Sequence, residues 1–373
     1  MATQAIFTQD LAGIEVGETS ISEVNGQSGQ LSYRGYPIAG LVEKPFWQVV
    51  WLLLFGSWPD LKQESALHEF MALHGNLDKS EQAMLGKLPG HLHPMLMLQG
   101  MVPLLNLEPR CHIDEVSTTA EAGLIIAAKL PSLVAAWRQL ETNGKAIHVN
   151  CDASFHENFL MMFNGCVPLP EQVRTLDAAQ ILQLEHSYNA GTFAGRVCAS
   201  THAPIQSSIS ASIGTLFGVL HGGADQAALE MAEKISKPEN AEAYVQECLE
   251  KNVKIMGMGH REYRVLDPRA KLLKPMAKSL CGRGDAERLF NTLVAVEDAC
   301  QQSFQRSGKE IWANVEFYKG AVFYQLGIPP KYFTTLFSMA RIYGYIAHFL
   351  EFSETSKLIR PRARYIGNRI QSA

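Results

Sequence analysis

The sequence predicts an all-α protein built from two compact units, with one short β-hairpin near its N-terminus. Its 373 residues exceed the length at which a single hydrophobic core stops growing, so two units are expected. Apolar residues recur at helical spacing over most of the chain after Pro45, whereas polar and apolar residues alternate only within 16–36. No internal repeat or low-complexity stretch interrupts this pattern.

The hairpin is predicted from residues 16–36, where polar and apolar positions alternate around Asn25-Gly26 and Gly29. Asn-Gly favours the tight turns that join two antiparallel strands. We expect the second strand to carry Tyr33, Arg34 and Gly35 into the next segment.

Helices are predicted where apolar residues repeat at helical spacing between Gly or Pro breakers. The first is the apolar run after Pro45, which stops at Gly56 and Pro59. A later segment is rich in Ser, Ala, Gly and Ile, and these residues suit a closely packed helix in the middle of a large bundle. In chain order the expected helical stretches of the first part are 46–54, 64–75, 118–141, 155–164, 172–187 and 205–220.

The composition changes between about residues 226 and 312, where charged residues increase and the expected helices become clearly amphipathic. We interpret this region as a smaller inserted domain. Its expected helices are 226–236, 239–252, 269–281 and 285–306. The segment 331–352 is instead apolar almost all round, which predicts a helix buried in the main core.

Charge and cysteine usage narrow the class of protein. The formal net charge of -4 and the pI of about 6.3 argue against a nucleic-acid-binding surface. Seven cysteines without a CxxC pair suggest neither a disulfide framework nor a zinc site, so no metal is expected. Residues 1–15 lack the features of a targeting segment. The apolar run 49–55 is too short to cross a bilayer, so we expect a cytoplasmic protein without a membrane partner.

Three residues suggest proton chemistry at carbon. His221 is followed by two glycines, His260 is preceded by Gly259, and Glu316 follows them along the chain. Glycine lets substrate or backbone come close to the neighbouring side chain. A carboxylate beside neutral histidines can remove a weakly acidic C–H proton while the imidazoles hold the enolate oxygen. The trio contains no nucleophile, so it indicates carbon–carbon bond chemistry.

Arginines add a requirement for an anion. Arg341 lies in the apolar stretch 331–352, with no acidic residue one turn away, and a buried guanidinium needs a partner of opposite charge. Arg269 and Arg360 are further candidates for a shared anion site, and guanidinium forks bind carboxylates bidentately. The pattern therefore predicts a pocket for a small dicarboxylate. Two alternatives remain open: Arg341 pairs with a carboxylate elsewhere in the fold, and Glu316 faces solvent as an inert group.

Seven motifs, in order along the whole chain, resemble those of the citrate synthase family, in its short bacterial and archaeal type. A single motif would carry little weight, but seven in register are highly specific. The first is the N-terminal hairpin, residues 17–22 and 31–36. The others are 185–193, 220–224, 257–269, 314–320, 340–351 and 360–367.

The resemblance implies a mostly helical large domain, residues 1–223 plus 327–373, and a small helical domain, residues 224–326. It also implies a homodimer with shared active sites, and it leaves a higher oligomer open. Oxaloacetate and an acyl-CoA are the expected partners. The coenzyme A thioester is a co-substrate, and no permanently bound cofactor is expected.

The same resemblance implies roles for single residues. His221 is expected to hold the acetyl-CoA carbonyl as it enolises, His260 to polarise the oxaloacetate ketone, and Glu316 to take the position of the catalytic base. The residues expected to bind oxaloacetate are His186, Arg269 and Arg341, with Arg360 reaching in from the partner subunit. Those expected to meet the phosphates of CoA are Arg264 and Lys309.

The chain departs from the family at the base itself, because Glu316 stands where the family has aspartate. The extra methylene moves the carboxylate by roughly 1 Å, and misplacement on that scale can cost about a hundredfold in rate. Several changes near one site suggest retuning or decay. The other departures are Lys319 for serine, Glu262 for valine, Gly191 for serine, Phe217 for lysine and Asp225 for asparagine.

The sequence thus predicts an acyltransferase that condenses acetyl-CoA with oxaloacetate and hydrolyses the citryl thioester to citrate and CoA. One alternative is 2-methylcitrate formation from propionyl-CoA, because one methylene in an apolar pocket is worth only about 1–3 kcal/mol. The other is a catalytically weak paralogue that acts as a ligand-binding or assembly protein, an alternative favoured by Glu316 and its altered neighbours.

Overall fold

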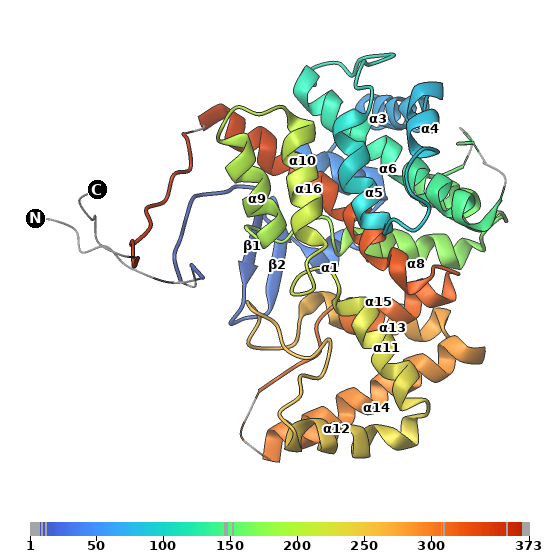
Figure 1. Cartoon of the computed structure of the whole chain (residues 1–373), viewed down its shortest axis with the longest axis vertical. Coiled ribbons are helices and arrows are strands. Elements are labelled where there is room, and N and C mark those ends of the chain that lie inside the picture. Colours follow the sequence, from blue (N-terminus) through green and yellow to red (C-terminus); the bar gives the residue numbers. More distant parts are fainter. Residues whose placement is uncertain are drawn as a thin grey trace, which may run out of the picture.

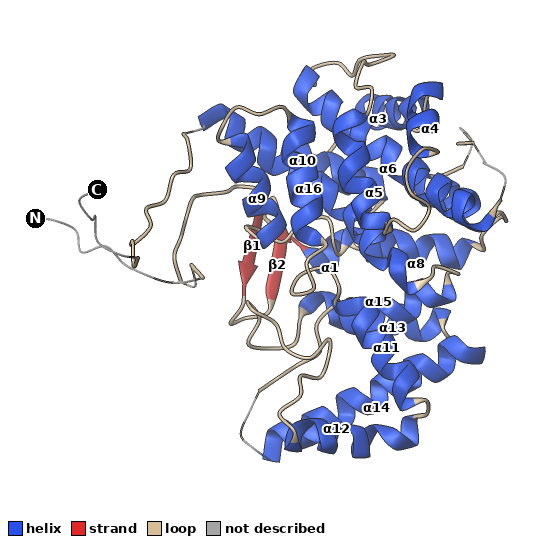
Figure 2. Cartoon of the chain, in the orientation of Figure 1, coloured by secondary structure: helices blue, strands red, loops and turns tan. Residues whose placement is uncertain are grey.

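The protein is a mostly helical assembly with a small sheet near its N-terminus (Figure 2), as the sequence predicts. The computed structural model describes residues 8, 10–11, 13–144, 148–150, 153–306, 308, 310–355 and 357–367. Its α-helices are α1 (Ile38–Leu41), α2 (Phe46–Phe55), α3 (Leu61–His74), α4 (Lys79–Leu85), α5 (Pro94–Met101), α6 (Thr118–Thr142), α7 (Phe155–Asn164), α8 (Pro170–Ile181), α9 (Ala190–Ala199), α10 (Ile205–Leu216), α11 (Ala224–Ile235), α12 (Ala241–Glu250), α13 (Pro268–Leu280), α14 (Gly284–Arg306), α15 (Glu316–Gln325) and α16 (Phe333–Thr355). Short 3-10 helices are η1 (Val102–Leu104), η2 (Pro238–Asn240) and η3 (Pro330–Tyr332).

The predicted hairpin is confirmed. Strand β1 (Ser22–Asn25) pairs antiparallel with β2 (Gln30–Tyr33), and the two-residue strand β3 (Tyr36–Pro37) adds to the far side of β2. The turn between β1 and β2 lies against residues 262–266. A Cβ on Gly26 would stand 2.0 Å from the carbonyl oxygen of Glu262, so only glycine permits this approach. The backbone N–H of Arg264 donates to the Gly26 carbonyl (2.8 Å), which fixes the contact.

Most predicted helices are present within a few residues of their expected bounds, but two end earlier than predicted. The expected helix 172–187 stops at Ile181, and Ser187 takes a left-handed backbone with φ 51°. The expected helix 205–220 stops at Leu216 and is followed by turns. The pattern does not indicate the short helices α4, α5, α9 and α15. Helices α5, α9 and α15 each contain glycine, which weakens a helical pattern.

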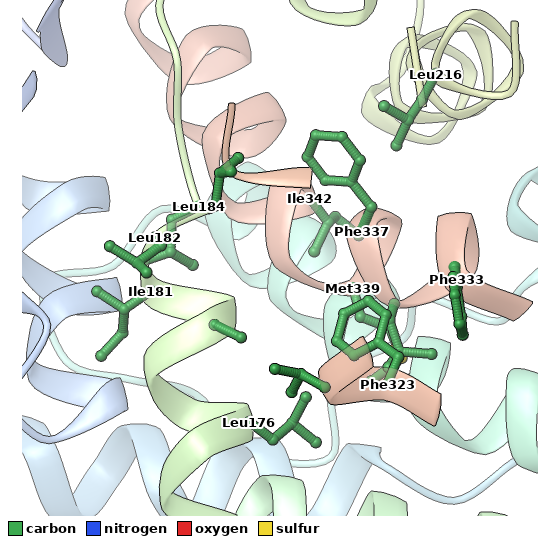
Figure 3. Packing of buried hydrophobic residues seen from close by; sticks show 14 of the residues in the cluster. Leu176, Ile181, Leu182, Leu184, Leu216, Phe323, Phe333, Phe337, Met339 and Ile342 are labelled. Atoms are coloured by element: carbon green, nitrogen blue, oxygen red, sulfur yellow. The ribbon is translucent and has the colours of Figure 1, made fainter. Parts of the chain in front are cut away.

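The helix predicted over 331–352 is α16, and it is buried along nearly its whole length, as expected. It contacts α2, α5, α6, α8, α9 and α10. Figure 3 shows Phe333, Phe337 and Ile342 of α16 in the same buried cluster as Leu176 of α8 and Leu216 of α10. This position brings α16 into contact with the turns that carry the candidate site residues.

Helix α6 is long and apolar enough to cross a membrane by length and composition alone, and 83% of its most apolar window is buried inside the protein. A core helix of a globular protein has these same properties. Its buried position (Figure 1) therefore assigns α6 to the protein core.

Helices α11 to α15 form a second group, which lies below α8 and α16 in the view of Figure 1. Their principal contacts join α11 with α15, α13 with α15, and α12 with α14. The group also touches the remainder of the chain, for example through α13 and α8. The division into domains at residues 224 and 326 stays a prediction.

Candidate active site

Six of the candidate residues form one electrostatically connected cluster, to which both groups of helices contribute. His186 and His260 face each other with ring centroids 5.3 Å apart. Electrostatic coupling joins His186 to His221, Arg269 and Arg341, and joins Glu316 to His221, His260 and Arg269. Residues that are widely separated in the sequence therefore form one cluster, as predicted from their motifs.

His221 lies in the turn between α10 and α11, and close packing requires glycine at the next position, Gly222. A Cβ on Gly222 would stand 2.4 Å from the Leu216 carbonyl oxygen and 2.7 Å from Cγ2 of Thr334 on α16. The Gly222 carbonyl in turn accepts a hydrogen bond from Oγ1 of Thr334 (3.0 Å). Glycine thus lets the turn sit directly on the buried helix and holds the imidazole at the site.

The imidazole of His221 is neutral and has a defined partner. Burial, reinforced by the guanidinium of Arg341, lowers the pKa of His221 to about 4. Its Nε2 lies 3.3 Å from Oδ1 of Asn189, the residue that caps α9. The amide nitrogen of Asn189 donates to Oγ1 of Thr192 (2.8 Å), so Oδ1 is the acceptor and Nε2 of His221 donates. This donor becomes available to a substrate oxygen once it leaves Asn189.

His260 is oriented by the loop that contains it. Its Nδ1 accepts the backbone N–H groups of Glu262 (3.0 Å) and Tyr263 (3.2 Å), so the neutral ring carries its proton on Nε2. Burial, with a further contribution from Arg269, lowers the pKa of His260. Nη2 of Arg269 lies 3.4 Å from Nε2 of His260. Both atoms are then donors, so they do not hydrogen-bond each other, and an acceptor oxygen placed between them would satisfy both.

His186 completes the group of three neutral imidazoles. It follows α8 and is buried, and its Nε2 lies 3.1 Å from the hydroxyl oxygen of Tyr263. Burial, followed by the charge of Arg269, lowers the pKa of His186 well below its usual range. A neutral imidazole donates one hydrogen bond without adding a cation to the site.

The two arginines in the site differ in how they are paired. Arg269 is buried against Asp267, with Nη2 to Oδ2 at 2.8 Å and Nε to Oδ1 at 3.0 Å. Arg341 is 1% exposed, and its Nε donates to the Gln183 carbonyl (2.8 Å). No carboxylate in the described part of the chain forms an ion pair with Arg341. The described residues therefore give no support to the alternative of a distant carboxylate partner for Arg341.

Glu316 is the first residue of α15, and it is 8% exposed rather than turned to the solvent. Its backbone N–H donates to Oδ1 of Asn314 (3.1 Å), and Nδ2 of Asn314 donates to the Gly259 carbonyl (3.0 Å). The start of α15 is thereby tied to the loop of His260. The carboxylate of Glu316 partly offsets the lowering of the pKa of His221 and of His260 by burial. It therefore lies within electrostatic reach of both imidazoles.

The remaining candidates are Arg264, Arg360 and Lys309, and Arg264 lines a small pocket of about 110 Å³ together with His260. Arg264 is exposed and lines a surface hollow of about 470 Å³ beside the hairpin turn, together with Glu23 and Glu262. Arg360 is exposed on the segment after α16, which runs away from the helices (Figure 1), so a single chain does not bring it to the site. Lys309 lies outside the described residues.

Sequence reasoning assigns no role to several residues that orient the site. Asn189 holds His221, Asp267 pairs with Arg269, and Tyr263 contacts His186. Each lies inside or next to a motif of the site histidines, and that proximity is the available signal. Within the described ranges, no group of three or more His, Cys, Asp or Glu residues is arranged to hold a metal ion.

Comparisons with known proteins show which proteins the chain resembles. Residues 10–362 match the family description "Citrate synthase, C-terminal domain". The chain is 34% identical to a citrate synthase of Synechocystis sp. over 99% of this chain and 93% of the relative. It is 33% identical to a 2-methylcitrate synthase of Shewanella oneidensis, covering 96% of this chain and 94% of the relative. Its fold is similar to that of a Thermoplasma acidophilum citrate synthase solved with carboxymethyl coenzyme A and oxaloacetate, with a TM-score of 0.90, 25% identity, and coverage of 99% of this chain and 98% of that one. The chain therefore belongs to the citrate synthase family.

Proposed function

We propose that this enzyme condenses acetyl-CoA with oxaloacetate through Glu316 as general base, and then hydrolyses the citryl thioester to citrate and CoA. One observation carries the proposal. Neutral His221 and His260, the buried carboxylate of Glu316 and the buried guanidinium of Arg341, which forms no ion pair among the described residues, belong to one electrostatically connected cluster. This combination suits abstraction of a proton from carbon next to a bound dicarboxylate.

The dicarboxylate is assigned to the arginines. Arg341 lacks a carboxylate partner among the described residues, and a bound oxaloacetate carboxylate supplies the missing charge. Nη1 of Arg269 takes no part in the hydrogen bonds to Asp267, which come from Nε and Nη2. His186 adds a neutral donor. We assign the ketone oxygen to the position between Nε2–H of His260 and Nη2 of Arg269, two nitrogens that lie 3.4 Å apart. The ketone is thereby polarised for attack.

Proton transfer and carbon–carbon bond formation follow. The carboxylate of Glu316 takes a proton from the acetyl methyl group as the C–H electron pair moves into the enolate. His221 donates its Nε2–H to the thioester oxygen, leaving Asn189 as it does so. The enolate carbon attacks the ketone carbon, the ketone oxygen takes the proton held by His260, and the proton taken by Glu316 replaces it. Water then attacks the citryl thioester, the C–S bond breaks, the acyl carbon keeps the hydroxyl group, and CoA leaves as the thiol with the other proton of that water.

The coenzyme A thioester is assigned to the surface beside the hairpin. Arg264 lines the hollow of about 470 Å³ there, and an exposed guanidinium suits a phosphate. Lys309 has the same proposed role, although it lies outside the described residues. We propose no permanently bound cofactor.

A homodimer is part of the proposal. The segment that carries Arg360 extends away from its own site (Figure 1), so this residue suits the site of a second copy. Exposed apolar side chains on and after α5 and on α9, Leu96, Leu104 and Val197, suit a subunit interface. A cytoplasmic location, without nucleic-acid or membrane partners, completes the proposal.

Propionyl-CoA is the second candidate substrate, because a 2-methylcitrate synthase is 33% identical to this chain and a citrate synthase 34%. A thiol-release assay with oxaloacetate and acetyl-, propionyl- or butyryl-CoA tests both. We expect the highest kcat/KM with acetyl-CoA. A preference for propionyl-CoA would favour 2-methylcitrate formation. No thiol release with any of the three would refute the proposed activity and leave the ligand-binding or assembly role.

A further inference from the structure

A buried ion pair lies next to the site, and no step proposed above uses it. Nζ of Lys319 is 3.1 Å from Oδ2 of Asp225, and both side chains are 0% exposed. A charge removed from water is costly unless good geometry and additional hydrogen bonds compensate. The Asp225 carboxylate accepts the backbone N–H of Gln226 at Oδ1 (2.8 Å), but within the described chain neither Nζ of Lys319 nor Oδ2 of Asp225 forms a well-aligned hydrogen bond. The pair is therefore a poor device for stability alone.

A second buried ion pair, Lys129–Glu81, has additional hydrogen bonds that offset the cost of burying its charges. Nζ of Lys129 lies 2.5 Å from Oε1 of Glu81 and donates to the Asn106 carbonyl (2.8 Å). The Glu81 carboxylate also accepts the backbone N–H groups of Asn106 (2.9 Å) and Asp78 (2.8 Å). This pair joins α4 and α6, far from the site (Figure 1). It provides a comparison, since it is also buried but carries additional hydrogen bonds on both partners.

The position of the Asp225–Lys319 pair gives it a different role. Asp225 is the second residue of α11, four residues after His221, and Lys319 lies on α15, three residues after Glu316. Residues three apart share one face of a helix. The ion pair thus joins the two segments that carry the imidazole and the carboxylate. At the same place a Cβ on Gly320 would stand 2.8 Å from the Asp225 carbonyl oxygen, so the two helices touch through backbone.

The Asp225–Lys319 pair is also connected, through one aromatic ring, to Arg341, a proposed oxaloacetate-binding residue. Nζ of Lys319 lies 4.4 Å from the ring centroid of Phe337, within range of a cation–π interaction. The same ring lies 4.8 Å from Cζ of Arg341 and packs edge-on against His221 with centroids 6.2 Å apart. A displacement of Lys319 would therefore also shift the ring of Phe337, which contacts both Arg341 and His221.

We propose that Asp225 and Lys319 are positioning residues that set the distance between His221 and Glu316, an inference that rests on the proposed condensation. Enolisation requires the carboxylate at the methyl group and the imidazole at the thioester oxygen of the same substrate. An ionic link between the two helix starts holds that separation for the longer glutamate side chain. Misplacement by about 1 Å reduces rates by about a hundredfold.

The test is the double variant Asp225→Asn with Lys319→Met, which removes both charges and nearly preserves side-chain volume. We expect kcat with acetyl-CoA to fall about ten- to a hundredfold. The KM for acetyl-CoA and the Kd for oxaloacetate should stay within about threefold, because the groups that bind these substrates are unchanged. The isotope effect on kcat with methyl-deuterated acetyl-CoA should increase, since proton abstraction becomes slower.

The matched control is Glu81→Gln with Lys129→Met, which should lower the melting temperature and leave kcat within about twofold. A kcat within twofold of wild type in a folded Asp225→Asn/Lys319→Met variant would overturn the inference, as would an unchanged isotope effect. If that variant fails to fold, Lys319→Arg keeps the charge but displaces it, and kcat should fall at least threefold at constant KM. An unchanged kcat in Lys319→Arg would also overturn the inference. Wild-type inactivity would instead refute the proposed function, so the two failures are distinguishable.

Discussion

Replacing Arg341 by Met separates binding from stability. The guanidinium is 1% exposed and has no carboxylate partner among the described residues, so we expect its charge to be matched by oxaloacetate. Two charge-assisted hydrogen bonds of about 1.5–3 kcal/mol each amount to about 3–6 kcal/mol. Their loss weakens oxaloacetate binding by roughly 10²- to 10⁴-fold. Because a buried, unpaired cation is removed, the ligand-free variant should melt no lower than wild type.

Calorimetric titration with oxaloacetate, together with thermal melting of the free protein, measures both effects. Arg196→Met is the matched control, because Arg196 is also buried but pairs with Glu351 (3.2 Å) and contacts His348 (3.1 Å). This control should melt lower and keep its affinity. His221→Ala should abolish condensation with oxaloacetate affinity nearly intact. An affinity loss under threefold in Arg341→Met, or equal losses in Arg341→Met and His221→Ala, would refute the reasoning.

Two further predictions concern the dimer and pH. Mixing Arg360→Ala and His221→Ala subunits should restore thiol release, because one site of each heterodimer regains a complete set, and no recovery would contradict the shared site. Burial and Arg341 lower the pKa of His221 to about 4, so below pH about 6.5 the unfolded chain binds a proton that the folded chain refuses. Stability from this group is thus full above pH 6.5 and is lost as the pH falls toward 4. Urea midpoints at pH 7 and 5 should differ more for wild type than for His221→Asn, and equal differences would contradict this.

Local sequence features predict much of the fold and mark the candidate site residues. The apolar stretch 331–352 indicates α16, and Asn25-Gly26 indicates the hairpin, because both signals depend on neighbouring residues alone. The glycines beside His221 and His260 likewise indicate close approaches, which the contact of Gly222 with Leu216 illustrates.

Contacts between distant segments are beyond such reasoning. The hydrogen bond from His221 to Asn189 joins residues 32 apart, and the Asp225–Lys319 pair joins α11 to α15. The sequence marks Lys319 and Asp225 as separate departures and does not reveal that they meet. Helix α9 is missed for a related reason, since its Asn189 cap is visible but its glycines weaken the helical pattern.

The central claim is that Glu316 is a working base in a site arranged for its length. The measurement is the turnover number of wild type, Glu316→Asp and Glu316→Ala with oxaloacetate and the best acyl-CoA. If the site is arranged for glutamate, the aspartate carboxylate falls short of the acyl α-carbon by roughly 1 Å, and turnover in Glu316→Asp drops up to about a hundredfold. Glu316→Ala should then show no turnover. A clear gain in Glu316→Asp, or turnover near the wild-type value in Glu316→Ala, would contradict the account.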